Sequence, residues 1–280
     1  MKTSNLLAFL FLTAQVVSAQ QITCSPKDKK AFEDKTIEID GLLEKDFGKT
    51  MAAVGKTFMG IPYVAKSLEI GETESLVVNL HGLDCTTYVE NVLAFSLLLR
   101  DGKADFDSFT KQLKTIRYKD GKLDGYGSRL HYFSEWIRDN ARKGLVVEIT
   151  SEIGGMAIQK DINFMGTHRD LYPFLKDDAN YATIIATEKK INKEPFCYLP
   201  LDQIEANEHL IQTGDIIALA TSISGLDVTH TGIAIREANG RIHLLHASTG
   251  SMEVEVSKLP LAAYLKGIKK NIGILVARPQ

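Results

Sequence analysis

Cysteine is scarce in this chain of 280 residues, which has three, and any excess of basic residues is absent. Lysine and arginine number 33 against 35 aspartates and glutamates, so the formal net charge is −2 at pH 7. Without a basic surplus, or a Lys/Arg stripe interleaved with aromatic residues, the sequence argues against a nucleic-acid partner. Low-complexity tracts and internal repeats are also lacking, which excludes disordered and solenoid proteins.

The composition that remains is typical of a soluble globular protein, with 44% hydrophobic and 24% charged residues. The length is enough for one large domain or two small ones, and for a sizeable core without disulfide bonds. Helical patterns come first and strand patterns come last. This order predicts an α+β fold.

The first 19 residues have the pattern of a secretory signal peptide. Lys2 precedes an apolar run, and Val17-Ser18-Ala19 supplies the small residues that signal peptidase reads. We expect cleavage after Ala19 and export to the periplasm or the extracellular space. The run is too short for a stable membrane anchor, and no later segment is long enough to span a bilayer. A lipoprotein would be lipidated at Cys24, but Thr23 is a poor residue before such a cysteine.

An odd number of cysteines in an exported chain leaves at least one free thiol. Cys24 and Cys197 could form a disulfide in an oxidising compartment. Cys85 is the best candidate for the free thiol, because it follows Asp84, a good N-cap residue. Cys85 is therefore expected to be the first residue of a helix. The positive helix end and its unpaired N–H groups would lower the thiol pKa and stabilise an oxyanion.

Periodicity places the other elements. Helical patterns cover about 27–56, 84–100, 106–115, 132–143 and 161–175, and strand patterns cover 75–80 and 145–149. From Gly214 onward, five short segments rich in β-branched residues predict an antiparallel meander.

Two histidines lie on neighbouring strands of this meander, because Asn239-Gly240 between them is a strong hairpin signal. The alternation of side chains along a strand puts His230, Gly232 and His246 on one face of the sheet. A helix end would have room to approach that face beside the glycine. His230 then suits a base for the thiol, and His246 its orienting partner. Two alternatives stay open: a cysteine that is only a small core residue, and a zinc site built from Cys85, His230 and His246.

Several separated motifs together resemble the NlpC-type papain-like cysteine hydrolases of bacterial cell walls. They are "GIPY" at 60–63, "DCTTYVENV" at 84–92, "GDIIA" at 214–218, "THTGIAI" at 229–235 and "LLHAS" at 244–248. Longer stretches, among them "RLHYFSEWIRDN" at 129–140, are similar to one branch of that family, the N-acetylmuramoyl-L-alanine amidases formerly catalogued as a domain of unknown function. The resemblance runs from about Phe47 to the last residue.

The resemblance implies a papain-like core, in which a cysteine-bearing helix packs on the antiparallel meander, with large helical insertions. Residues 20–280 would form a single amidase domain with an inserted lobe at about 103–210. Cys85 matches the nucleophile, His230 the base and His246 the orienting residue. Tyr63 matches a tyrosine that lines the site and helps to hold the oxyanion.

Further residues match the branch motifs less specifically. Asp84, Arg129, His131, Tyr132 and Asp227 are predicted substrate contacts. For the three residues at 129–132 a packed helix start is an equal alternative, and for Asp227 the alternative is a loop cap. The gaps around Cys85 are longer than in typical family members, so extra lobes are expected to wall the cleft.

The implied activity is hydrolysis of the bond between N-acetylmuramic acid and L-alanine in peptidoglycan fragments (muropeptides), with no cofactor or metal. One alternative is an endopeptidase that cuts between D-glutamate and the diamino acid of the stem peptide. Another is a cell-wall binding module with a degenerate site. The preferred fragment and the oligomeric state are not specified by these patterns.

Overall fold

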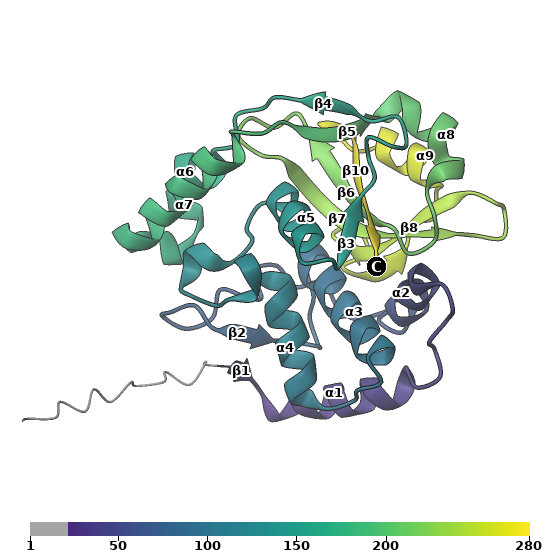
Figure 1. Cartoon of the computed structure of the whole chain (residues 1–280), viewed down its shortest axis with the longest axis horizontal. Coiled ribbons are helices and arrows are strands. Elements are labelled where there is room, and N and C mark those ends of the chain that lie inside the picture. Colours follow the sequence, from purple (N-terminus) through teal and green to yellow (C-terminus); the bar gives the residue numbers. More distant parts are fainter. Residues whose placement is uncertain (1–21) are drawn as a thin grey trace, which may run out of the picture.

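Helices and one large antiparallel sheet make up the computed structural model, which describes residues 22–280 (Figure 1). The predicted signal peptide at 1–19 lies outside the described residues. The helices are α1 (Pro26–Glu38), α2 (Phe47–Lys56), α3 (Cys85–Arg100), α4 (Phe106–Arg117), α5 (Phe133–Arg142), α6 (Phe164–Thr167), α7 (Asp178–Ile191), α8 (Ile204–Asn207) and α9 (Leu261–Lys266). The α+β class is therefore confirmed.

The strands form a two-stranded and an eight-stranded sheet. They are β1 (Ile22–Cys24), β2 (Leu76–Val78), β3 (Val146–Glu148), β4 (Met156–Ile158), β5 (Phe196–Pro200), β6 (Ile216–Thr221), β7 (Val228–Arg236), β8 (Ile242–Ser248), β9 (Glu253–Val256) and β10 (Asn271–Pro279). The large sheet has the order β4-β5-β10-β6-β7-β8-β9, and β3 also pairs with β10.

The predicted five-stranded meander is correct for four strands and wrong for the fifth. Strands β6 to β9 pair in sequence order, but β10 pairs with β6 on the opposite side of the meander. Helix α9 separates β9 from β10 and carries the chain across the sheet. The strand patterns alone contain no information about which edge the last strand joins.

Helix α3 is the central helix of the fold. Twelve of its sixteen residues are buried, from Thr87 to Leu98 without interruption. Each fully buried Leu or Val side chain contributes about 1.5–3 kcal/mol relative to an exposed one. A helix that is buried on every side is rigid, so a side chain at its end is held in a fixed position.

The large sheet is covered on both faces by different helices (Figure 1). On one face Ile233 and Leu245 pack with Tyr88 of α3 in the main hydrophobic core. On the other face Ala234 and Leu244 pack with Leu261 of α9 in a second core. Strand alternation therefore decides which core each side chain of β7 and β8 enters.

Two helix predictions were wrong in their bounds. The pattern at 27–56 is broken between α1 and α2, where Gly41 has a φ of +81° and Asp46 caps the next helix. The helix expected at about 161–175 consists of the four-residue α6 and short 3₁₀ turns. The long helix of this region is α7, which follows Asp177 as N-cap.

Within the segment 103–210, predicted as an inserted lobe of a single domain, strands β3 and β5 pair with β10 of the large sheet. All three cysteines are free. Strands β1 and β5, which carry Cys24 and Cys197, lie at opposite ends of the molecule (Figure 1). This separation is too large for a disulfide within one chain.

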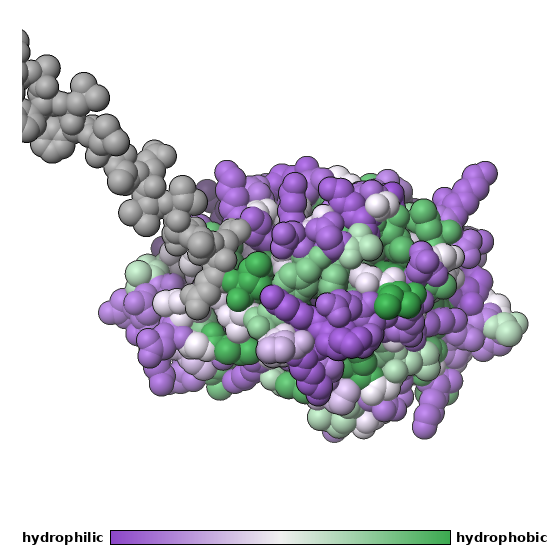
Figure 2. Space-filling view, turned by 90° about the horizontal axis from the view of Figure 1, so that it is seen from below, coloured by the Kyte–Doolittle hydropathy of each residue, from purple (hydrophilic) through white to green (hydrophobic). Residues whose placement is uncertain are grey.

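The face on which α1 lies is covered mainly by hydrophilic side chains, with apolar residues in small groups (Figure 2). Scattered apolar residues of this kind are normal on a protein surface. Among residues 22–280, no helix is both long and apolar enough to cross a membrane.

Candidate active site

Cys85 is the first residue of α3, as the sequence predicted, and Asp84 is the N-cap. The Asp84 carboxylate accepts a hydrogen bond from the Thr87 backbone N–H at 2.8 Å. The Thr87 hydroxyl in turn accepts one from the Asp84 backbone N–H at 2.9 Å. This reciprocal capping box fixes the start of the helix and therefore the position of the thiol.

The pKa of the Cys85 thiol differs from the sequence-based expectation. Burial, followed by the negative charge of Asp84, raises the pKa of the thiol to about 11. Hydrogen bonds from Thr231 and Thr86 oppose this shift and are outweighed. The expected lowering of the pKa was wrong, because the loss of hydration on burial outweighs the hydrogen bonds that favour the thiolate. Cys85 is therefore a neutral thiol at neutral pH.

Strand β7 meets the start of α3 at Thr231. The Thr231 hydroxyl donates to the Cys85 carbonyl oxygen at 2.9 Å, and the Thr231 backbone N–H faces the thiol. His230 is the preceding residue of the strand, next to this contact with the helix start. Within residues 22–280, no hydrogen bond joins the thiol to either His230 or His246.

The two imidazoles form the pair that the sequence predicted. His230 Nε2 and His246 Nδ1 are 2.6 Å apart, and the rings are nearly perpendicular. His246 is 1% exposed, and the ring of Tyr264 on α9 packs edge-on against it. Burial lowers the pKa of His230 to about 3 and that of His246 to about 4, so both rings are neutral.

The prediction that α3 approaches the Gly232 face of β7 was wrong. Helix α3 packs on the opposite face, with Ile233, whereas Gly232 faces His246. A Cβ atom on Gly232 would lie 2.9 Å from His246 Cβ and 2.8 Å from Leu244 Cδ1. The glycine therefore makes room for the buried imidazole, and the helix end reaches the strand from the other side.

Tyr63 lies close to the thiol. Residues 62–64 form a short ladder with Leu83: the Leu83 N–H donates to the Pro62 carbonyl, and the Val64 N–H donates to the Leu83 carbonyl. Burial raises the pKa of Tyr63 to about 12, and the charges of Cys85 and Asp84 add to the rise. The phenol therefore keeps its proton at neutral pH and is a hydrogen-bond donor.

A cavity of about 180 Å³ opens beside the N-cap of α3. It brings together two of the predicted substrate contacts, Asp84 and Arg129, and its walls come from the segments at 66–69 and 171–172. Segments of the predicted extra lobes therefore wall a space beside Asp84, the N-cap residue. We call this space the N-cap pocket. Its lining residues are Lys66, Leu68, Glu69, Asp84, Arg129, Leu171 and Tyr172.

Arg129 is 6% exposed and its charge is balanced within the protein. It pairs with Glu69 at 2.6 Å and Glu74 at 3.5 Å, and its guanidinium lies 4.9 Å from the ring centre of Tyr126. Two carboxylates and an aromatic face leave little of the guanidinium for a ligand. These contacts favour the structural alternative, and a substrate role for Arg129 stays a prediction.

His131 and Tyr132 also have internal partners. His131 Nε2 is 2.9 Å from the Tyr126 carbonyl oxygen, and burial moves the His131 pKa well below its usual value. The Tyr132 hydroxyl donates to Glu188 at 2.7 Å and accepts from the Met165 N–H at 2.9 Å. Tyr132 is the N-cap residue of α5. The packed helix start is therefore what the structure supports for these two residues.

Asp227 caps α5 from a distant part of the chain. Its carboxylate is 1% exposed and accepts from the backbone N–H of Ser134 at 2.8 Å and of Val228 at 2.7 Å. Ser134 lies in the first turn of α5, and Val228 begins β7. The carboxylate thus ties the strand of His230 to a helix of the 103–210 segment, which matches the loop-cap alternative.

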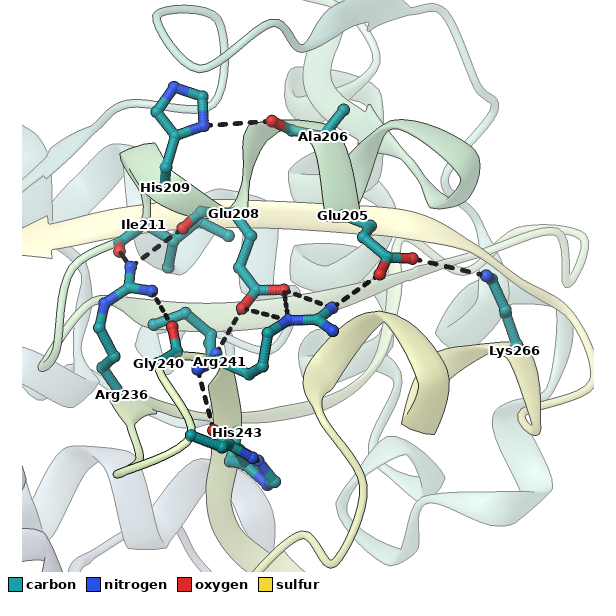
Figure 3. A network of polar contacts seen from close by, with 12 residues as sticks. Glu205, Ala206, Glu208, His209, Ile211, Arg236, Gly240, Arg241, His243 and Lys266 are labelled. Carbon is teal, nitrogen blue, oxygen red and sulfur yellow. Dashed lines mark hydrogen bonds and ion pairs between the residues drawn. The ribbon is translucent and has the colours of Figure 1, made fainter.

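The far end of the β7–β8 hairpin is fixed by a polar network (Figure 3). Arg241 places its guanidinium between Glu208, at 3.0 Å, and Glu205, at 3.0 Å. Glu208 is buried and also accepts from the Ile242 N–H at 2.6 Å, while Arg236 donates to the carbonyl of Gly240. The two strands that carry the imidazoles are therefore held in register at the turn end of the hairpin.

Sequence reasoning missed Thr231 and Lys66. Thr231 stands within the "THTG" motif, and its contact with the helix start depends on which sheet face α3 covers. Lys66 lies in a loop without periodicity, so the sequence contains no signal for it. Elsewhere in the described chain, no three His, Cys, Asp or Glu side chains are grouped as metal ligands, and Cys85, His230 and His246 are not so grouped either.

Comparison with known proteins adds independent information. The AmiA-like family model, described as N-acetylmuramoyl-L-alanine amidase-like, matches residues 53–274. An N-acetylmuramoyl-L-alanine amidase from Bacteroides uniformis ATCC 8492 is 39% identical, and the alignment covers 84% of this chain and 99% of that one, with a TM-score of 0.80. No curated protein matches this sequence.

Two further solved structures are similar. A Bacteroides fragilis protein with the provisional name of a xylanase is 41% identical, over 80% of this chain and 98% of that one, with a TM-score of 0.76. A Legionella pneumophila protein is 22% identical, over 90% of this chain and 95% of that one, with a TM-score of 0.66. At that identity the likeness is one of fold alone.

Proposed function

This chain belongs to the N-acetylmuramoyl-L-alanine amidase-like family, and we propose that it is a cysteine amidase acting on peptidoglycan fragments. The bond cleaved joins the lactyl group of N-acetylmuramic acid to L-alanine. One observation carries the proposal: the thiol of Cys85 sits on a capped helix start, against the strand that holds the paired imidazoles of His230 and His246.

Nucleophilic attack starts from a neutral thiol and a neutral imidazole, because burial raises the pKa of Cys85 and lowers that of His230. The proton therefore moves from Sγ to His230 as the carbon–sulfur bond forms. The required tautomer has His230 Nε2–H donating to His246 Nδ1, which leaves His230 Nδ1 as the acceptor. His246 thus sets the orientation and tautomer of the base.

The tetrahedral oxyanion is stabilised by the free N–H groups at the start of α3 and by the Tyr63 hydroxyl. His230 then gives its proton to the leaving amine of L-alanine, and the carbon–nitrogen bond breaks to leave a thioester. The same imidazole next takes a proton from water, which attacks the thioester. Release of the lactyl carboxylic acid returns the proton to Cys85.

We also propose that the core is papain-like and of the NlpC type. The support is the arrangement in which a cysteine at a helix start meets histidines on adjacent antiparallel strands. By contrast, a xylanase activity, suggested by the name of one relative, calls for two carboxylates flanking the scissile bond. The reactive groups on the helix start and the adjacent strands are a thiol and two imidazoles, which favours acyl chemistry.

Export is part of the proposal. Peptidoglycan lies outside the cytoplasmic membrane, and residues 1–19 have the pattern of a secretory signal. The protein would then meet its substrate in the periplasm or outside the cell. Its partners would be muropeptides.

The test is a digest of a defined disaccharide-tetrapeptide followed by mass spectrometry. The expected products are the free disaccharide and a stem peptide that begins with L-alanine. The Cys85→Ala variant should lose at least about 10³-fold in kcat while keeping the wild-type thermal midpoint. A disaccharide that still carries L-Ala-D-Glu, together with a dipeptide that begins with the diamino acid, would instead establish the endopeptidase. Activity that survives Cys85→Ala but is lost with EDTA would rule out the thiol mechanism.

A further inference from the structure

The N-cap pocket contains a positive charge that no protein carboxylate neutralises. Lys66 lies on its wall, and the Lys66 ammonium donates to the Leu171 carbonyl oxygen at 3.1 Å. That oxygen is a neutral acceptor. Within residues 22–280 the Lys66 ammonium forms no ion pair, so two of its three N–H donors remain for a ligand.

The other charges of the pocket are already matched. Arg129 faces Glu69 and Glu74, as described above. Asp84 uses one carboxylate oxygen on the Thr87 N–H and hydroxyl, at the positive end of α3. Lys66 is therefore the cationic group of the pocket that has no carboxylate partner, and it is complementary to an anion.

The backbone at Lys66 indicates that its position is specified. Its φ is +57°, in the left-handed region that residues other than glycine seldom adopt. Such conformations persist where surrounding contacts hold them, and they gather at ligand sites. Here the contact to Leu171 joins the two wall segments across the pocket.

The chemistry of the substrate identifies the anion, on the basis of the proposed function. In a muropeptide the lactyl carboxyl of muramic acid is consumed in the amide to L-alanine, and the sugars bear hydroxyl and acetamido groups. The carboxylates therefore lie on the peptide side of the scissile bond. The first of them is the α-carboxylate of D-glutamate, the residue that follows L-alanine.

The volume of the pocket agrees with this assignment. About 180 Å³ is well below the roughly 300 Å³ at which pockets for whole drug-sized ligands begin, so it suits one residue of a longer substrate. We propose that the N-cap pocket is the subsite for the second residue of the stem peptide, and that Lys66 selects a free α-carboxylate there over a carboxamide.

The experiment compares two substrates that differ in this one group: N-acetylmuramoyl-L-Ala-D-Glu and N-acetylmuramoyl-L-Ala-D-isoglutamine. We expect the wild-type protein to cleave the acid with a kcat/KM about three- to tenfold above that for the amide, because a partly exposed ion pair contributes modestly. Lys66→Gln should bring the ratio to about one, and Lys66→Arg should retain most of it. Added salt should shrink the wild-type preference.

Lys258→Gln is the matched control, since Lys258 is exposed on the loop before α9 and is not part of the pocket lining. Its substrate ratio should equal that of the wild type. Equal cleavage of both substrates by the wild type, or a preference for the amide, would overturn the Lys66 assignment and leave the amidase intact. Cleavage of neither substrate at the lactyl–alanine bond would refute the proposed function, and the subsite with it.

Discussion

The thiol of Cys85 lies at a helix start, a position that usually lowers a cysteine pKa, and yet it is neutral. The hydrogen bonds from Thr231 and Thr86 favour the thiolate, and burial beside Asp84 disfavours it more strongly. In the proposed mechanism, catalysis then depends on the transfer of a proton to His230 during attack.

This balance predicts the pH dependence of alkylation at Cys85. Iodoacetamide reacts with the thiolate, so the rate in the substrate-free protein should rise about tenfold per pH unit from pH 7 and level off near pH 11. Peptide mapping by mass spectrometry follows Cys85 separately from the other two cysteines, and an unfolded peptide of residues 80–90 serves as reference. A rate that is already maximal at pH 7 would demonstrate a preformed thiolate and contradict the neutral pair.

At single residues, the sequence predicted where each side chain lies along its helix or strand better than it predicted the contacts and burial of that side chain. The cap at Asp84 and the hairpin at Asn239-Gly240 are local signals, so Cys85, His230 and His246 could be placed without a structure. The thiol pKa and the role of Gly232 depend on which sheet face α3 covers, and that choice is tertiary. Arg129 looked free in sequence because its partners, Glu69 and Glu74, belong to a distant segment of the chain.

At the level of elements, β7 and α5 are linked through a single buried carboxylate. The Asp227 carboxylate accepts hydrogen bonds from two backbone N–H groups, one on each element. Ordinary N-caps, such as Asp105 on α4, belong to the helix that they cap. This cap from a distant part of the chain therefore fixes the start of β7, the strand of His230, to the first turn of α5.

Replacing Asp227 tests this link. Asp227→Ala leaves two N–H groups without their partner in a buried setting, so the free energy of unfolding should fall by about 2–3 kcal/mol. Denaturant titration measures the loss. Asp227→Asn, which keeps one acceptor oxygen, should lose less, and Asp105→Ala at an exposed cap should lose less again. Equal losses for the Asp227→Ala and Asp105→Ala variants would show that Asp227 is an ordinary cap.

Element prediction succeeded where burial patterns are strong and failed where they are weak. Helix α3 and strands β6 to β8 have dense apolar periodicity, and their bounds were close to the predicted ones. Helix α7 is largely exposed and has four buried residues, so its apolar periodicity is weak. The apolar residues at about 161–175 give a stronger helical pattern, and the helix is predicted there instead. Pro173 and Gly166 lie in that earlier stretch and argue against a continuous helix there.

At the scale of the whole molecule, the proposed location depends on a segment outside the described residues. If the signal at 1–19 is functional, the mature protein begins at Gln20, two residues before β1. N-terminal sequencing of protein recovered from the periplasm or medium should therefore give Gln-Gln-Ile-Thr-Cys. Replacing Leu10 and Leu12 in the apolar run with arginine should keep the protein in the cytoplasm with its N-terminus uncut.

The position of β10 also has a consequence for the order in which the molecule becomes active. This strand is the last of the described strands to be synthesised, yet it lies inside the sheet, between β6 on one side and β3 and β5 on the other. A nascent chain that ends before residue 271 has two open inner edges and no continuous sheet behind His230. The proposed amidase activity should therefore depend on residues 271–279, because they complete the sheet behind His230.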